Sequence, residues 1–94
     1  MIRNMKIRFA ENFRKQYDKS GGKIKTAFDK RLKLFIKAPF NSLLNNHPLT
    51  GKYLNYRSIN ITGDWRAIYS KHIDENEERI IIFELLGTHS QLYK

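Results

Sequence analysis

The second half of the chain carries a small set of side chains that could move protons and hold a phosphate. His47, Asp64 and His89 can each donate or accept a proton, and Arg66 offers a permanent charge on a forked donor. Such a set suits metal-free cleavage of RNA, in which the substrate's own 2′-hydroxyl attacks the adjacent phosphorus. The protein then has to take the proton of that hydroxyl, protonate the leaving 5′ oxygen and neutralise the crowded phosphate.

Each of these residues also has an ordinary structural explanation. His47 precedes a proline and could be a solvated loop residue, and Asp64 follows a glycine, as in many hairpin turns. Trp65 is of a type that fills a core more often than it contacts a ligand. The third histidine, His72, adjoins an acidic stretch, and we assign it to solvent. The combination, rather than any one residue, favours the catalytic interpretation.

The composition excludes several other classes of site. With three histidines and no cysteine, the chain can form neither a disulfide nor a cysteine-rich zinc site. It has no Gly-rich phosphate loop and no EF-hand spacing. We therefore expect no metal and no cofactor. Every apolar run is far shorter than the roughly 20 residues that span a bilayer, and the first residues lack a signal-peptide core. We expect a cytoplasmic protein that does not contact a membrane.

The strands that must position these side chains can be read from alternation. Residues 56–62 place Ile59 and Ile61 on one face of a strand, and residues 62–64 form a turn into a second strand. In that second strand, Trp65, Ala67 and Tyr69 share one face, and the intervening residues, beginning with Arg66, share the other.

The rest of the chain supplies the elements around these strands. Alternation predicts a short strand over residues 5–9, and apolar residues four apart predict a helix over 11–19. Two glycines break that helix, and a longer one runs to the Ala38-Pro39 pair. Residues 45–52 are expected to be a loop, and residues 74–78 an exposed hairpin tip. A final strand over 79–86 is apolar enough to be central in a sheet, and a turn follows it.

This order of elements predicts an α+β fold in one domain over residues 1–94. It reads strand–helix–helix–three strands, with a mainly antiparallel sheet and the two N-terminal helices packed on one face. The other face of the sheet is expected to be open. We predict that this open face, with the His47 loop and the C-terminal turn at its rim, forms one concave basic site.

The positive charge is concentrated at the start of the chain. Residues 1–37 hold twelve Lys/Arg and three Asp/Glu, and residues 38–94 hold six of each, so the whole excess of +9 lies in the first third. A surface of this kind favours a polyanion such as RNA, or an acidic protein. It could also be an ordinary solvated helix face. We expect ribosomal RNA or an acidic partner to contact the stripe formed by Lys30, Lys33 and Lys37.

Four motifs, taken in order, carry a family resemblance. They are His47-Pro48-Leu49-Thr50-Gly51, Tyr56-Arg57, Asp64-Trp65 and Gly87-Thr88-His89, the last followed by Leu92-Tyr93. The set resembles the RelE/ParE superfamily of bacterial toxins, and most of all its YafQ-like branch of messenger-RNA interferases. The resemblance implies a type II toxin that cleaves messenger RNA on the ribosome and is neutralised by a cognate antitoxin. Any binding to operator DNA would then pass through the antitoxin.

The resemblance also implies roles for individual residues. His47, Asp64 and His89 would carry the proton transfers, with His89 as the acid and either His47 or Asp64 as the base. Trp65 would shape the site, and Tyr93 would stack on a base. The remaining substrate or phosphate contacts are expected from Arg66, Arg57 and Lys52. The chain departs from the YafQ-like pattern at Asn60, where that branch has a further histidine, and at Arg66, where it tends to have an aliphatic residue.

Two other functions remain open from the sequence. A ParE-like toxin would share the fold and block gyrase without cutting RNA, although such a surface has no need of these histidines. A non-catalytic homologue that binds RNA or the antitoxin is the second alternative, and Asn60 is the residue that keeps it open.

Overall fold

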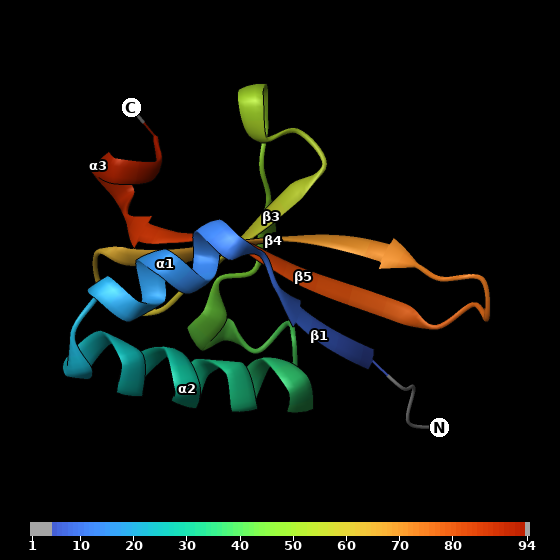
Figure 1. Ribbon diagram of the computed structural model, residues 1–94, viewed down its shortest axis with the longest axis horizontal. Coiled ribbons are helices and arrows are strands. Elements are labelled where there is room, and N and C mark those ends of the chain that lie inside the picture. Colours follow the sequence, from blue (N-terminus) through green and yellow to red (C-terminus); the bar gives the residue numbers. More distant parts are fainter. Residues whose placement is uncertain (1–4, 94) are drawn as a thin grey trace.

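Five strands form a single sheet in the computed structural model, which describes residues 5–93 (Figure 1). Their order across the sheet is β1-β5-β4-β3-β2. The bounds are β1 (Met5–Phe9), β2 (His47–Pro48), β3 (Tyr56–Asn60), β4 (Trp65–Ile73) and β5 (Arg79–Thr88). β1 runs parallel to β5, and the other pairs are antiparallel. The predicted α+β class and mainly antiparallel sheet are confirmed.

The helices are α1 (Glu11–Lys19), α2 (Gly22–Lys37) and α3 (His89–Leu92), with 3-10 turns η1 (Ser42–Leu44) and η2 (Gly51–Tyr53). Gly21, between α1 and α2, has a positive φ of 89°, a conformation that glycine adopts at little cost. α2 ends immediately before Ala38-Pro39, as the proline predicts. Among the described residues, no helix is long and apolar enough to cross a membrane.

The main core lies between the sheet and the two long helices. We call this side of the sheet the helix face. Phe13 of α1 and Phe28 of α2 pack with their ring centroids 5.0 Å apart, and both contact Phe83 of β5. Ile59 of β3, Ile61 just beyond its end, and Ala67 and Tyr69 of β4 belong to the same cluster. The alternation therefore assigned these faces correctly.

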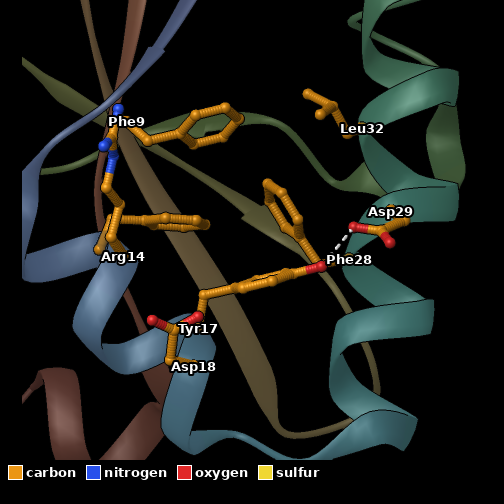
Figure 2. A pocket seen from close by; sticks show the side chains of 8 residues that line it. Phe9, Arg14, Tyr17, Asp18, Phe28, Asp29 and Leu32 are labelled. Carbon is orange, nitrogen blue, oxygen red and sulfur yellow. Dashed lines mark hydrogen bonds between the residues drawn. The ribbon is translucent and has the colours of Figure 1, made fainter.

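The two long helices leave a hollow over the end of β1. Figure 2 shows this cavity of about 360 Å³, lined by the rings of Phe9, Phe13, Tyr17 and Phe28. The Tyr17 hydroxyl donates a hydrogen bond to Asp29 across it, 2.9 Å long, which ties α1 to α2. This hydrogen bond to a carboxylate raises the pKa of Tyr17.

The opposite face of the sheet, here the distal face, is not open as predicted. A second apolar cluster covers part of it, formed by Leu49, Ile68 and Leu92 with half-buried tyrosines around them. Figure 1 places α3 and the η2 segment on the side of the sheet opposite α2. Ile68 points away from the helices, and Leu49 and Leu92 cover it. Removing such a side chain from water stabilises the fold by about 1.5–3 kcal/mol.

Two local features also differ from the predictions. His47–Pro48 was expected in a loop, but it forms β2, a fifth strand whose backbone pairs with Ser58 and Arg57. β5 carries one extra residue, Glu84, between the partners of Ile68 and Tyr69. The bulge leaves the alternation of β4 intact, and β5 runs on to Thr88 rather than ending near residue 86.

Candidate functional site

One end of the distal face brings two of the predicted catalytic residues together. Asp64 lies in the turn before β4, and its backbone carbonyl accepts a hydrogen bond from the backbone N–H of His89 at 3.0 Å. Both side chains are exposed. The contact joins residues that are 25 positions apart in the sequence, so an imidazole and a carboxylate project from the same end of the sheet into solvent.

The short helix α3 that carries His89 is fixed at its start. The Thr88 hydroxyl accepts the Gln91 backbone N–H, and the Gln91 side chain accepts the Thr88 backbone N–H, which is a complete capping box. Gly87 leaves room for α3 to fold back, because a Cβ there would lie 3.0 Å from Gln91 Oε1. His89 is thus anchored through its backbone while its ring stays accessible.

Aromatic rings surround His89 on its inner side. The rings of His89 and Tyr93 lie 4.7 Å apart, and Tyr93 meets Tyr53 edge-on at 5.7 Å. The Tyr53 hydroxyl donates a 2.7 Å hydrogen bond to the Leu92 carbonyl, which locks η2 onto α3. The ammonium of Lys52 lies over the Tyr53 ring at 5.1 Å. Tyr93 therefore lies beside His89, and Lys52 is connected to it only through the rings of Tyr53 and Tyr93.

His47 is held at the far edge of the sheet by its own neighbours. Its Nδ1 lies 2.8 Å from the Asn45 carbonyl. A carbonyl only accepts, so Nδ1 carries the proton and Nε2 of the neutral ring is free to accept one. Asn46 fixes the preceding backbone, since its side chain accepts from Arg57 Nε and from the Tyr69 hydroxyl and donates to the Pro39 carbonyl.

His47 and His89 lie on the same face of the sheet but not in direct contact. The register runs from His47 through Ser58 to Ile68, so His47 points to the distal face. Asp64 lies four residues before Ile68, roughly 14 Å along β4 and about two strand spacings from β2. His89 follows Thr88 of β5, about one strand spacing further across. The cluster of Leu49, Ile68 and Leu92 joins the two segments.

The two arginines take different places. Arg66 is on the distal face, as predicted, but one guanidinium nitrogen donates to three carbonyls of the β3–β4 turn, those of Thr62, Gly63 and Trp65. Arg66 thus braces the turn that presents Asp64. Arg57 pairs with Tyr69 and points to the helix face, where it lies 5.3 Å over the Phe40 ring. Arg57 was expected to contact substrate or phosphate, but it faces away from the distal face that carries His47, because successive residues of a strand point to opposite faces.

Two polar atoms of β3 are buried on the distal face without a partner in the described part of the chain, Ser58 Oγ and Asn60 Oδ1. Ser58 stands opposite His47, and Asn60 stands opposite Arg66. Buried polar atoms normally have a hydrogen-bond partner. Asn60 therefore offers a buried acceptor on the strand beside Arg66.

The comparisons with known proteins fit this geometry. Residues 5–94 match the family described as bacterial toxin of type II toxin-antitoxin system, YafQ. The chain belongs to this family. It is a YafQ-like type II toxin, and the predicted resemblance is confirmed.

Individual relatives agree with the family. The mRNA interferase toxin YafQ of Escherichia coli strain K12 is 31% identical over 55 residues, which are 58% of this chain and 54% of that protein. A mutant of YafQ from E. coli has a similar structure, with a TM-score of 0.76, 23% identity and coverage of 97% of this chain and 100% of that one. The E. coli DinJ-YafQ toxin-antitoxin complex matches over 100% of both chains with 23% identity and a TM-score of 0.70.

The remaining predicted residues of this YafQ-like chain lie on the helix side. Trp65 is half-buried on the helix face and packs against the main core, so it backs the site rather than projecting into it. Lys30, Lys33 and Lys37 are exposed along α2. No carboxylate of the described residues forms a salt bridge with these three lysines. They leave α2 with a positive surface on the side of the molecule away from His89.

Several contacts of this site were missed in the sequence. Asn46 positions the backbone before His47, and Tyr53 positions α3, which carries His89. The spacing of Tyr53 from Tyr56 is the one sequence signal for the tyrosine pair that packs beside α3. The Ser70 hydroxyl donates to Glu84 at 2.6 Å and lies 2.9 Å from His72 Nε2. His72 is exposed, as predicted, and its ring also contacts the Ser70 hydroxyl. Within residues 5–93, no group of three or more His, Cys, Asp or Glu residues is placed to hold a metal ion.

Proposed function

We propose that this toxin is an endoribonuclease that cleaves messenger RNA in the cytoplasm, on the ribosome and without a metal ion. The observation that carries the proposal is the pairing of Asp64 with His89 at an accessible end of the sheet, beside aromatic rings, in a chain of the YafQ family. A curated relative is named an mRNA interferase toxin. Acid–base groups, rather than a phosphate loop or a nucleophilic side chain, are the chemistry that the site offers.

The reaction would proceed by transfer of the phosphoryl group within the RNA. The 2′ oxygen forms a bond to phosphorus while the bond from phosphorus to the 5′ oxygen breaks, leaving a 2′,3′-cyclic phosphate and a 5′-hydroxyl. His89 donates a proton to the leaving oxygen: its backbone is held by Asp64 and its ring rests against Tyr93 while staying exposed to substrate. The base is His47 or Asp64. Asp64 is the nearer of the two, because its backbone binds that of His89, whereas the neutral His47 ring, whose Nδ1 proton is held by the Asn45 carbonyl, offers Nε2 as an acceptor from farther along the sheet.

Phosphate and base contacts follow from the groups around His89. Lys52 and the guanidinium nitrogens of Arg66 that do not bind the turn would neutralise the phosphate. Tyr93 would stack on a base next to the cleaved bond, while Trp65 supports the turn from behind. Arg57 would act indirectly, by holding Asn46 and so the backbone before His47.

The partners proposed for this chain are the ribosome with its messenger RNA and a cognate antitoxin. DinJ-YafQ is a toxin-antitoxin complex of the same fold. The exposed lysines of α2 fit either ribosomal RNA or an acidic segment of the antitoxin. Contact with operator DNA would pass through the antitoxin. The lysines lie away from His89, so binding and chemistry would use different surfaces.

Induced expression followed by mapping of RNA 5′ ends tests the proposal. We expect growth arrest together with new 5′ ends inside translated messages. Growth arrest without new 5′ ends would replace the proposal with a gyrase-directed toxin. Neither effect, from a soluble protein, would indicate a non-catalytic homologue in which Asn60 has taken the place of a required histidine.

A further inference from the structure

The end of the sheet that carries the β4–β5 hairpin extends past the C-terminal end of α2 (Figure 1). α2 ends at Lys37, and a turn at Pro39 and Phe40 follows it. A groove of about 390 Å³ lies between this turn and the hairpin, and we call it the hairpin groove. Phe40 lines it on the side of the turn, and Met5 and Ile73 line it on the side of the sheet.

The hairpin groove is apolar because the alternation of the strands continues beyond the helix. Ile73 of β4 and Ile81 of β5 face the same side of the sheet as the core residue Tyr69. Ile81 is buried, but Ile73 is 71% exposed and Phe40 across the groove is 68% exposed. Large apolar side chains that line one surface groove and are rimmed by polar groups mark a site of protein interaction.

The rim of the hairpin groove is basic. Lys71 and Arg79 belong to its lining, both are exposed, and within residues 5–93 neither forms a salt bridge. The acids of the hairpin do not neutralise them, because Asp74 and Glu78 are paired with Lys6, whose side chain points to the distal face. Two free cations beside apolar side chains are complementary to a ligand that is both acidic and apolar.

These features select among the possible occupants. A second copy of this chain would bring a net charge of +9 and the same two cations against the groove, which like-charge repulsion opposes. An RNA strand would satisfy Lys71 and Arg79 but would set its charged backbone against Ile73. A protein segment that carries both carboxylates and apolar side chains satisfies all three residues.

We propose that the hairpin groove binds an acidic segment of the antitoxin. Apolar side chains of that segment lie between Phe40 and Ile73, and its carboxylates meet Lys71 and Arg79. The inference rests on the antitoxin partner of the proposed function and not on the proposed cleavage of RNA. Asp64 is seven residues before Lys71, roughly 23 Å away along β4, so the groove is separate from the residues proposed for catalysis.

Binding of short synthetic peptides to the full chain tests this proposal. The probe peptide alternates leucine with glutamate. One control peptide has serine in place of every leucine, and the other has lysine in place of every glutamate. Fluorescence anisotropy measures the affinities, and NMR maps the backbone amides whose resonances shift during the titration. We expect only the leucine–glutamate peptide to bind, with the largest shifts at Lys71, Ile73 and Arg79.

Two variants remove the charge and the apolar contact separately. Lys71→Gln combined with Arg79→Gln should weaken binding of the probe peptide about tenfold, as the loss of two ion pairs at a solvated rim implies. Ile73→Ser should also weaken it about tenfold, because less apolar surface is then removed from water. The exposure of all three side chains means that the fold should tolerate these changes.

Each variant has a matched control elsewhere on the surface. Arg14→Gln combined with Lys23→Gln removes the same two kinds of charge from exposed positions of α1 and α2. Leu54→Ser removes an apolar side chain that is 64% exposed and follows η2. Both controls should bind the probe peptide as tightly as the wild type.

The outcomes decide the proposal without reference to RNA cleavage. Equal weakening by the Arg14 and Lys23 control, or equal binding of the serine peptide, would reduce the effect to net charge and overturn it. Polyuridine that binds the wild type and loses affinity only in the Lys71 and Arg79 variant would assign the groove to nucleic acid instead. A wild type that binds the peptide at the groove but cuts no message supports this inference and overturns only the nuclease. If Ile73→Ser does not fold, as judged by circular dichroism, the charge variant and the two control peptides give the decision.

Discussion

Asn46 links three parts of the molecule through its side chain, and its replacement by alanine should be among the most costly changes outside the apolar core. Its oxygen accepts hydrogen bonds from Arg57 Nε at 2.9 Å and from the Tyr69 hydroxyl at 3.0 Å. Its NH2 group donates to the Pro39 carbonyl at 2.8 Å. Tyr69 is only 2% exposed, so Asn46→Ala would leave its hydroxyl without an acceptor and out of reach of water.

The magnitude can be worked from these contacts. The bonds to Arg57 and Pro39 contribute about 1 kcal/mol each, and the unpaired hydroxyl of Tyr69 adds about 1–3 kcal/mol. The free energy of unfolding should therefore fall by about 3–5 kcal/mol, which corresponds to about 12–40 °C in Tm for a domain of this size. Denaturant unfolding and thermal unfolding at neutral pH measure it.

Tyr69→Phe provides the matched control, because it removes the hydroxyl together with its need for a partner. That variant should cost only about 1 kcal/mol. In the Tyr69→Phe background, Asn46→Ala should then cost about 1–2 kcal/mol less than in the wild type, since contacting residues couple by that order. Equal costs in the two backgrounds would refute the reasoning, as would an Asn46→Ala variant with the wild-type Tm.

Two further predictions concern the charges. In the first, Lys30, Lys33 and Lys37 of the exposed α2 stripe are all replaced by glutamine. This variant should weaken ribosome binding and reduce the slope of log Kd against log salt by about two to three. An unchanged slope would show that the stripe has another role. In the hairpin tip, the backbone N–H of Glu78 holds the pKa of Asp74 below its usual 3.8, with a smaller contribution from Lys6. Because the folded pKa is depressed, the stabilisation is present above pH 3.8 and is lost as the pH falls through the lower folded value. The difference in Tm between wild type and Asp74→Asn should therefore shrink below about pH 4, and a difference independent of pH would contradict this.

The parts of the fold that the sequence predicted are those set by local rules. The break at Ser20-Gly21-Gly22 and the proline at position 39 bound the two long helices, because both act on the backbone of their immediate neighbours. Alternation assigned Ile59 and Ile61 to the helix face and Arg66 to the other face, since period two leaves no choice once one face is apolar.

The parts that the sequence did not predict depend on contacts between distant segments. β2 has only two residues and exists because β3 pairs with it, so His47 carries no local strand signal. The cover over the distal face joins Leu49, Ile68 and Leu92, none of which is a neighbour of another along the chain. Arg57 was expected beside the substrate, and its true direction depends on the pairing with Tyr69.

The candidate site, too, was predictable in its residue types but not in its tertiary contacts. Residue types and order placed Asp64 and His89 in one reaction, but the backbone bond between them and the ring of Tyr93 against His89 are tertiary. The role of Arg66 in bracing the turn was equally invisible, because its three acceptors are carbonyls of a turn whose shape the sequence does not specify. Side-chain chemistry was readable, and side-chain partners were not.

The central claim is that His89 supplies the proton to the leaving oxygen, and a single substitution tests it most directly. His89 is exposed and its hydrogen bond in the fold uses the backbone, so His89→Ala should keep the wild-type Tm and antitoxin binding. Messenger-RNA cleavage on purified ribosomes, measured as single-turnover rates for both proteins, should fall by about 10²–10⁴-fold. A folded His89→Ala variant that cuts as fast as the wild type would contradict the account.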